Sequence, residues 1–111
     1  MKLNINWNDP IIADADVMKL TANDLDDFYC TASELDKSNL FFVLLTSLHY
    51  YEEKKDIEKA AHLSFLTANY LFVALTPPGS YNLALHYMKK AVFLNPKSEY
   101  HEWYRLMEQG N

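Results

Sequence analysis

The side chains that most often perform chemistry are sparse in this sequence. Four histidines, His49, His62, His86 and His101, are spread over 111 residues. No two of them are four residues apart, which is the spacing that places two imidazoles on one helix face to hold zinc. The histidines therefore predict no metal ion.

The other candidates for chemistry also have simpler explanations. Cys30 is the single cysteine, and we expect it to be buried among apolar neighbours as a small hydrophobic residue. Asp14 and Asp16 match the start of a calcium loop, but Met18 occupies the next ligand position. The two glycines lie far apart and form no phosphate-binding loop. The sequence thus predicts a protein that is not an enzyme and that carries neither a cofactor nor a metal ion.

The net charge of -5 is unevenly distributed along the chain. Residues 1–38 contain eight acidic and three basic residues, whereas residues 39–111 contain seven of each. Because there is no basic stripe, we expect no binding to nucleic acid. The acidic third is either a solvated surface or a surface for a basic partner. The second interpretation assigns the contacts to five aspartates: Asp14, Asp16, Asp24, Asp26 and Asp27.

Composition indicates a folded protein that does not insert into a membrane. Half of the residues are hydrophobic and 14% are aromatic, which is enough for a core. The longest apolar runs, 40–45 and 70–75, are far shorter than the roughly 20 residues of a membrane span. The lone cysteine and the lack of a secretory leader favour a reducing compartment. We therefore expect a cytoplasmic protein.

Turn and capping residues divide the chain into an arm and one helical domain. Residues 1–20 show no helical period and are expected to form an extended or partly ordered arm. Residues 21–111 then form a single all-α domain of about five helices. Thr21 and Asp24 resemble a capping box that opens a first helix near 22–35.

The remaining helices are predicted from their stop and start signals. Ser38 can cap a second, largely apolar helix that is buried on more than one side and ends in the charged run 52–56. Asp56 can cap a third helix over about 57–75, although one continuous helix over 39–75 stays open. Ser80 can cap a fourth helix, which ends at Asn95. A last helix begins at Ser98 and is ended by Gly110.

Residues 79–96 carry a pattern that is more specific than a capped helix. Two alanines seven residues apart let two helices pack closely, a large apolar residue fills the space between them, and proline ends the unit. A glycine and an aromatic residue precede the first alanine. This pattern is formed by Gly79, Tyr81, Ala84, Met88, Ala91 and Pro96. It resembles the second half of a tetratricopeptide repeat, and the resemblance to this repeat extends over roughly residues 63–110.

The resemblance implies a short solenoid of stacked antiparallel helix pairs whose inner surface binds a partner. Because the first helix of each pair lines that surface, the resemblance assigns partner binding to Phe65, Asn69, Val73, Tyr100 and Trp103. Val73 and Trp103 also fit a simple core role. Two helices with almost no polar face leave apolar surface for an amphipathic helix of another protein or for a second copy.

Size, acidity and fold class together resemble the cytoplasmic chaperones of bacterial type III secretion systems. That resemblance implies a chaperone or adaptor that shelters an apolar helix of a client until export. Two other functions are open. One is an inhibitor or immunity protein whose acidic third binds a basic partner. The other is a structural subunit of a homo- or hetero-oligomer.

Overall fold

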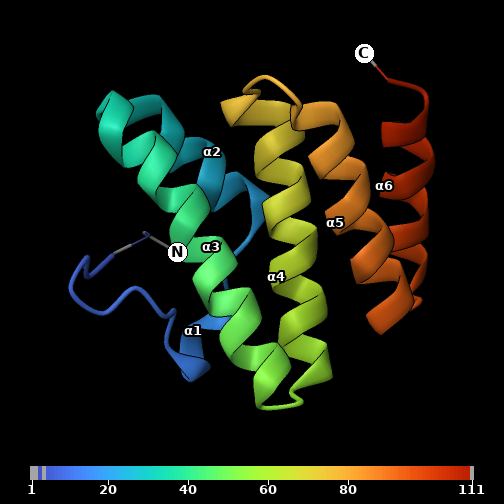
Figure 1. Ribbon diagram of the computed structural model, residues 1–111, viewed down its shortest axis with the longest axis horizontal. Helices are drawn as coiled ribbons and strands as arrows, with labels where there is room; N and C mark the ends of the chain where they lie inside the picture. The colour runs from blue at the N-terminus through green and yellow to red at the C-terminus, as the bar shows by residue number, and fades with distance from the viewer. Residues whose placement is uncertain (1–2, 4, 111) are drawn as a thin grey trace.

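The computed structural model of the protein describes residue 3 and residues 5–110. Four of its helices stand side by side in a row (Figure 1). In chain order they are α3 (Glu34–Glu53), α4 (Ile57–Asn69), α5 (Ser80–Leu94) and α6 (Ser98–Glu108). Neighbouring helices in the row run in opposite directions. The described residues contain no strand, so the all-α prediction is confirmed.

Two shorter helices and a π-helix complete the fold. The π-helix η1 (Tyr70–Leu75) continues α4 and ends at Thr76, whose backbone is left-handed with φ of 41°. α2 (Ala22–Thr31) packs against η1, and the single-turn α1 (Asp14–Val17) packs against α4. Pro77 follows this bend and lacks an amide proton, so the helix stops where the sequence predicted.

The helix starts are only partly those that the sequence predicted. The Thr21–Asp24 capping box is present, and the Asp56 side chain accepts from the Lys59 amide. The first helix was predicted too long, because Ser33, not Ser38, caps α3 by accepting from the Asp36 amide. An extended Ala32 therefore separates α2 from α3. Ser80 is also not a cap; Gly79 holds that position at a φ of 81°, which favours glycine.

The turn between α3 and α4 separates these two helices, which settles the alternative of one long helix. Lys55 adopts a left-handed backbone with φ of 59°, and its amide donates to the Glu52 carbonyl. A single left-handed residue ends a helix. The two helices then pack side by side along their lengths.

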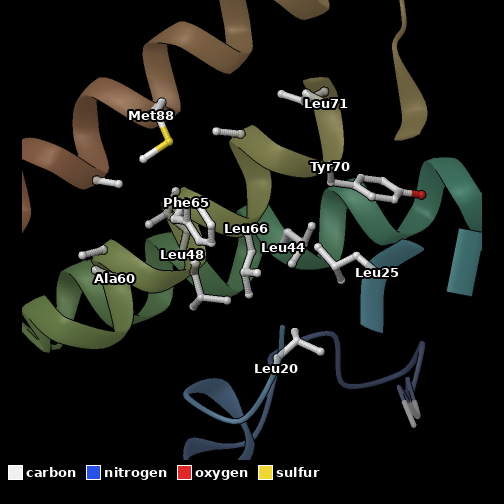
Figure 2. Packing of buried hydrophobic residues seen from close by; sticks show 14 of the residues in the cluster. Leu20, Leu25, Leu44, Leu48, Ala60, Phe65, Leu66, Tyr70, Leu71 and Met88 are labelled. Carbon is white, nitrogen blue, oxygen red and sulfur yellow. The ribbon is translucent and has the colours of Figure 1, made fainter. Parts of the chain in front are cut away.

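α4 lies at the centre of the core. Every residue from 63 to 71 is buried, because α3 covers one side of this segment and α5 covers another. Figure 2 shows Leu44 and Leu48 of α3 beside Leu66 of α4, with Leu20 and Leu25 approaching from the arm and α2. A helix that is apolar on nearly every face is stable only in such surroundings.

α3, by contrast, is buried on one side only, and the prediction that it is covered on several sides was wrong. Leu40, Leu44 and Leu48 are fully buried, whereas Leu35 and Phe42 are 70% and 61% exposed. No helix among the described residues covers this outer face of α3. The thiol of Cys30 on α2 is likewise exposed rather than buried.

The close approach of α4 and α5 is visible in their contacts. Ala84, Met88 and Ala91 of α5 are completely buried. The Ser64 hydroxyl of α4 reaches across and donates to the Tyr87 carbonyl of α5 at 2.6 Å. Small residues at this contact therefore bring the two backbones close together, as the alanine spacing predicted.

Residues 10–20 lie against the helical row. The Ser47 hydroxyl contacts both the Ile12 amide, at 2.9 Å, and the Pro10 carbonyl, at 3.3 Å. The Tyr51 hydroxyl donates to the Ile12 carbonyl at 2.6 Å. Val17 and Leu20 are fully buried in the common core. The segment that showed no helical period is thus anchored by α3 through its backbone.

Candidate protein-binding groove

One groove runs between the start of α2, the side of α4 and α6, and we call it the α4–α6 groove. Its first part, about 290 Å³, is lined by Thr21, Ala22, Asn23, His62, Phe65, Glu99 and Trp103. Its second part, about 300 Å³, is lined by Glu99, Glu102, Trp103 and Leu106. Because Glu99 and Trp103 line both parts, the two hollows lie next to each other.

Aromatic side chains form the floor of this groove. The Phe65 ring lies 6.1 Å from the Trp103 ring in an edge-to-face arrangement and 5.1 Å from the Tyr100 ring. Phe65 and Tyr100 are 5% and 1% exposed, so their buried ring contact holds α6 against α4. Trp103 is partly exposed above them, and Leu106 is 48% exposed. The groove therefore offers a rigid apolar surface to solvent.

The α6 face of the groove follows from helical spacing. Glu99, Trp103 and Leu106 are at positions i, i+4 and i+7 of α6, so they share one face. Tyr100 and Met107 occupy the neighbouring face and are buried. α6 thus packs with one stripe on the core and turns the adjacent stripe toward the groove.

His62 forms one wall of the groove and joins α4 to the end of the arm. Its Nε2 lies 2.7 Å from the Leu20 carbonyl, so this nitrogen carries a proton and donates. Burial lowers the pKa of His62, although the hydrogen bond to Leu20 acts in the opposite direction. The ring is therefore mainly neutral at pH 7 and presents an apolar face.

The two charged side chains that line the groove are both acidic and both belong to α6. Glu99 and Glu102 line the groove, and its lining contains no lysine or arginine. Lys97 lies at the edge, with its Nζ 3.8 Å from a Glu99 oxygen and 4.7 Å from the centre of the Tyr100 ring. Burial raises the pKa of the Tyr100 hydroxyl to about 12, with smaller contributions from the charges of Glu99 and Glu58.

The structure brings together three of the five residues predicted to bind a partner. Phe65, Tyr100 and Trp103 form the aromatic cluster, but Tyr100 is fully buried and supports the floor without reaching solvent. Asn69 and Val73 lie outside the groove lining. Asn69 is 3% exposed, and its amide nitrogen has no partner among the described residues, whereas Val73 is 49% exposed on η1.

Sequence reasoning missed several groove residues that helical spacing indicates. His62 precedes Phe65 by three residues, and Glu99 and Leu106 flank Trp103 at helical distances. His62 was considered only as a zinc ligand. The contribution of α2 could not be found in this way, because it depends on how the capping box meets α4 in space.

The residues that match the repeat pattern within 79–96 help to hold α5 in place beside α4 and α6. Gly79 provides the left-handed turn before α5, and Ala84, Met88 and Ala91 hold α5 against α4. The Tyr81 hydroxyl donates to the Glu108 carbonyl at 3.0 Å and so connects α5 to the end of α6. Pro96 is exposed in the α5–α6 turn.

A second, acidic hollow lies beside α2 on another part of the surface. It measures about 650 Å³ and is lined by Leu3, Asp24, Asp27, Phe28, Thr31, Ala32 and Asp36. Asp24 is 8% exposed, and one of its oxygens accepts from the Thr21 amide at 2.9 Å. Burial acts to raise the pKa of Asp24, the hydrogen bonds from Thr21 act to lower it, and the pKa is lowered overall.

Two features are absent from the described part of the chain. No group of three or more histidine, cysteine, aspartate or glutamate side chains is arranged there to hold a metal ion. None of its helices has both the length and the apolar character needed to cross a membrane.

Comparison with known proteins adds no assignment to this geometry. The chain matched no protein-family model, no curated protein and no solved structure.

Proposed function

We propose that the protein is a small chaperone or adaptor that binds an apolar helix of another protein in the α4–α6 groove. The observation that carries the proposal is the aromatic floor. The buried Phe65 ring contacts both the Trp103 ring and the buried Tyr100 ring, and Trp103 and Leu106 remain partly exposed. Exposed aromatic and aliphatic side chains in a groove are the usual anchors for an amphipathic helix.

The residues of the groove favour binding over catalysis. Its one histidine already donates to the Leu20 carbonyl, and its two glutamates lie on α6. The lining contains no cysteine or serine that a base could activate. Shape and apolar surface are therefore what the groove can offer a partner.

The specific form that we propose is a cytoplasmic chaperone of a secretion apparatus. The resemblance of residues 79–96 to a tetratricopeptide repeat supports stacked helix pairs, and the buried Ala84, Met88 and Ala91 agree with it. In this mechanism the groove covers the apolar face of a client helix, prevents self-assembly of the client and releases it at export.

A matched pair of surface substitutions tests the proposal. The tagged full-length protein is used as bait in its native cell, and each captured protein is purified and titrated against variants. Leu106→Ser changes an exposed leucine in the groove, and Leu35→Ser changes an exposed leucine on the outer face of α3. We expect Leu106→Ser to lower the affinity for a genuine client about 10-fold or more and Leu35→Ser to leave the affinity unchanged. Equal effects of the two substitutions would refute the groove as the binding site.

The acidic hollow beside α2 favours a second candidate, an inhibitor or immunity protein for a basic partner. Asp27 and Asp36 line that hollow, and no lysine or arginine does. Asp24 is already engaged in the capping box, so the charge reversals should be Asp27→Lys and Asp36→Lys. If these reversals abolish binding of a captured partner while Leu106→Ser does not, the inhibitor function replaces the chaperone function.

A further inference from the structure

We propose that the partner helix carries lysine or arginine beside its apolar anchors, so that the α4–α6 groove selects basic amphipathic helices. This inference rests on the proposed function and specifies the chemistry of the partner. Two features of the groove carry it, namely the position of the apolar floor and the sign of the charges around it.

The apolar floor fixes where the anchors of the partner lie. Trp103 and Leu106 are one turn apart on α6, and Phe65 lies behind Trp103. A helix laid along α6 meets these residues with its own i, i+3 or i+4 apolar positions. The residues that flank its anchors then lie over the rim of the groove.

The rim is acidic on the α6 side. Glu99 precedes Trp103 by one turn, and Glu102 precedes Leu106 by one turn. The lining contains no basic residue to neutralise them. Among the described residues, only Lys97 forms an ion pair with a carboxylate of the rim, with its Nζ 3.8 Å from an oxygen of Glu99. Glu102 has no ion-pair partner within the described part of the chain.

The charges near the rim are of both signs. Glu58 is close enough for its charge to act on both His62 and Tyr100, and Lys97 acts on His62 with the opposite sign. His62 itself is mainly neutral at pH 7 because burial lowers its pKa. Arg105 is on α6 but outside the groove lining. A lysine or arginine of the partner can therefore pair with Glu99 or Glu102 and also lie against the Trp103 ring. A glutamate at the same place would be repelled.

A displayed peptide library tests the charge preference directly. The library consists of helices of about 15 residues, which span roughly 22 Å, with leucines fixed at helical spacing. Each remaining position is drawn from lysine, glutamate, glutamine and serine. Parallel selections use the full-length protein, its Trp103→Ala variant and its Leu106→Ser variant. Clones that are enriched on the native protein but lost on either variant are groove binders.

We expect lysine to exceed glutamate at positions beside the leucines of these clones. One clone is then synthesised, and its affinity is measured for two double variants. Glu99→Gln/Glu102→Gln should weaken binding about 3- to 10-fold, since each exposed ion pair contributes modestly. Glu34→Gln/Glu53→Gln, which removes the same charge from α3, should leave the affinity unchanged. Added salt should lower the affinity of the peptide for the native protein more than its affinity for Glu99→Gln/Glu102→Gln.

The outcomes separate this inference from the function on which it rests. If groove binders emerge with neutral or acidic flanks, the groove function stands and the preference for basic helices is wrong. The preference is equally wrong if lysine-rich clones bind Glu99→Gln/Glu102→Gln as tightly as the native protein. If no clone depends on Trp103 or Leu106, both the groove function and the inference fail.

Discussion

His62 and Trp103 show how single side chains acquire their roles from the residues around them. Histidine and tryptophan are both intermediate in how often they are buried, and the sequence left a core role open for Trp103. In the structure the partly exposed Trp103 ring packs edge-to-face on the Phe65 ring, while the Nε2 of His62 donates to the Leu20 carbonyl at 2.7 Å. Their neighbours, rather than their residue types, place them in the groove.

Acid should destabilise the protein partly through His62. In the unfolded chain a histidine takes up a proton near pH 6.5, whereas burial lowers the pKa of His62 in the folded state. As the pH falls below 6.5 the unfolded state binds more protons, so the free energy of unfolding decreases. We expect His62→Gln, which can still donate to Leu20, to reduce this dependence in urea unfolding between about pH 7.5 and pH 5.5.

His86→Gln is the control for this prediction. His86 is exposed on α5, so its replacement should keep the pH dependence of the native protein. A His62→Gln variant with the native pH dependence would show that His62 does not link protonation to folding.

At this scale the partner-binding residues predicted from the sequence include all three members of the aromatic cluster and two residues outside it. Phe65 and Trp103 were found because repeat spacing places them on facing helices. Asn69 and Val73 were assigned to the same surface on an ideal α-helical register. The chain changes to a π-helix at Tyr70, and the wider turn moves Val73 off that register. Asn69 precedes the π-helix and is buried at the end of α4.

At the scale of elements, helix pairing depends on small residues at contacts and on side chains that hold the arm. α4 and α5 approach closely because Ala84 and Ala91 face the contact, and the Ser64 hydroxyl bonds to the Tyr87 carbonyl. The alanine spacing made this contact predictable. The boundary between α2 and α3 was not predicted in the same way, since Ser33 and Ser38 are both suitable caps and the structure uses Ser33, which accepts from the Asp36 amide.

Enlarging Ala84 should push α4 and α5 apart. Ala84 is fully buried, so Ala84→Leu adds methyl groups to a packed contact and should lower the free energy of unfolding by about 1–3 kcal/mol. Asn82→Leu adds the same side chain at an exposed position of α5 and should change it by less than about 0.5 kcal/mol. Urea denaturation compares the two. Similar free energies of unfolding for both variants would mean that the α4–α5 contact can accommodate a leucine at position 84.

The arm should detach when its hydrogen bonds to α3 are removed. Tyr51→Phe deletes the donor to the Ile12 carbonyl, and Ser47→Ala deletes the contacts with Ile12 and Pro10. Each loss should cost about 0.5–1.5 kcal/mol, and the double variant should be cleaved faster within residues 5–13 by dilute protease. Tyr50→Phe alters a neighbouring, 36% exposed tyrosine and should be cleaved at the native rate. Unchanged cleavage of the double variant would show that apolar contacts alone hold the arm.

At the scale of the whole molecule, the arm and the helical row share one core. The buried cluster extends from Val17 and Leu20 through α4 to Met107 near the C-terminus. The radius of gyration of 13.0 Å is that of a compact domain of this length. The sequence predicted the helices and the apolar content, but the docking of residues 10–20 depends on contacts with Ser47, Tyr51 and His62 that no local pattern encodes.

A shared core predicts that distant substitutions unfold the protein as one unit. Leu20 in the arm and Met107 in α6 are both fully buried, so Leu20→Ala and Met107→Ala should each lower the free energy of unfolding by about 2–5 kcal/mol. Trp7 is replaced by phenylalanine so that Trp103 alone reports on the groove by fluorescence, while far-ultraviolet circular dichroism reports on all helices. The two signals should change together, and Leu20→Ala should shift the Trp103 transition as far as Met107→Ala does. If Leu20→Ala leaves the Trp103 transition in place, the arm and the groove fold independently, as units of a loosely coupled repeat array would.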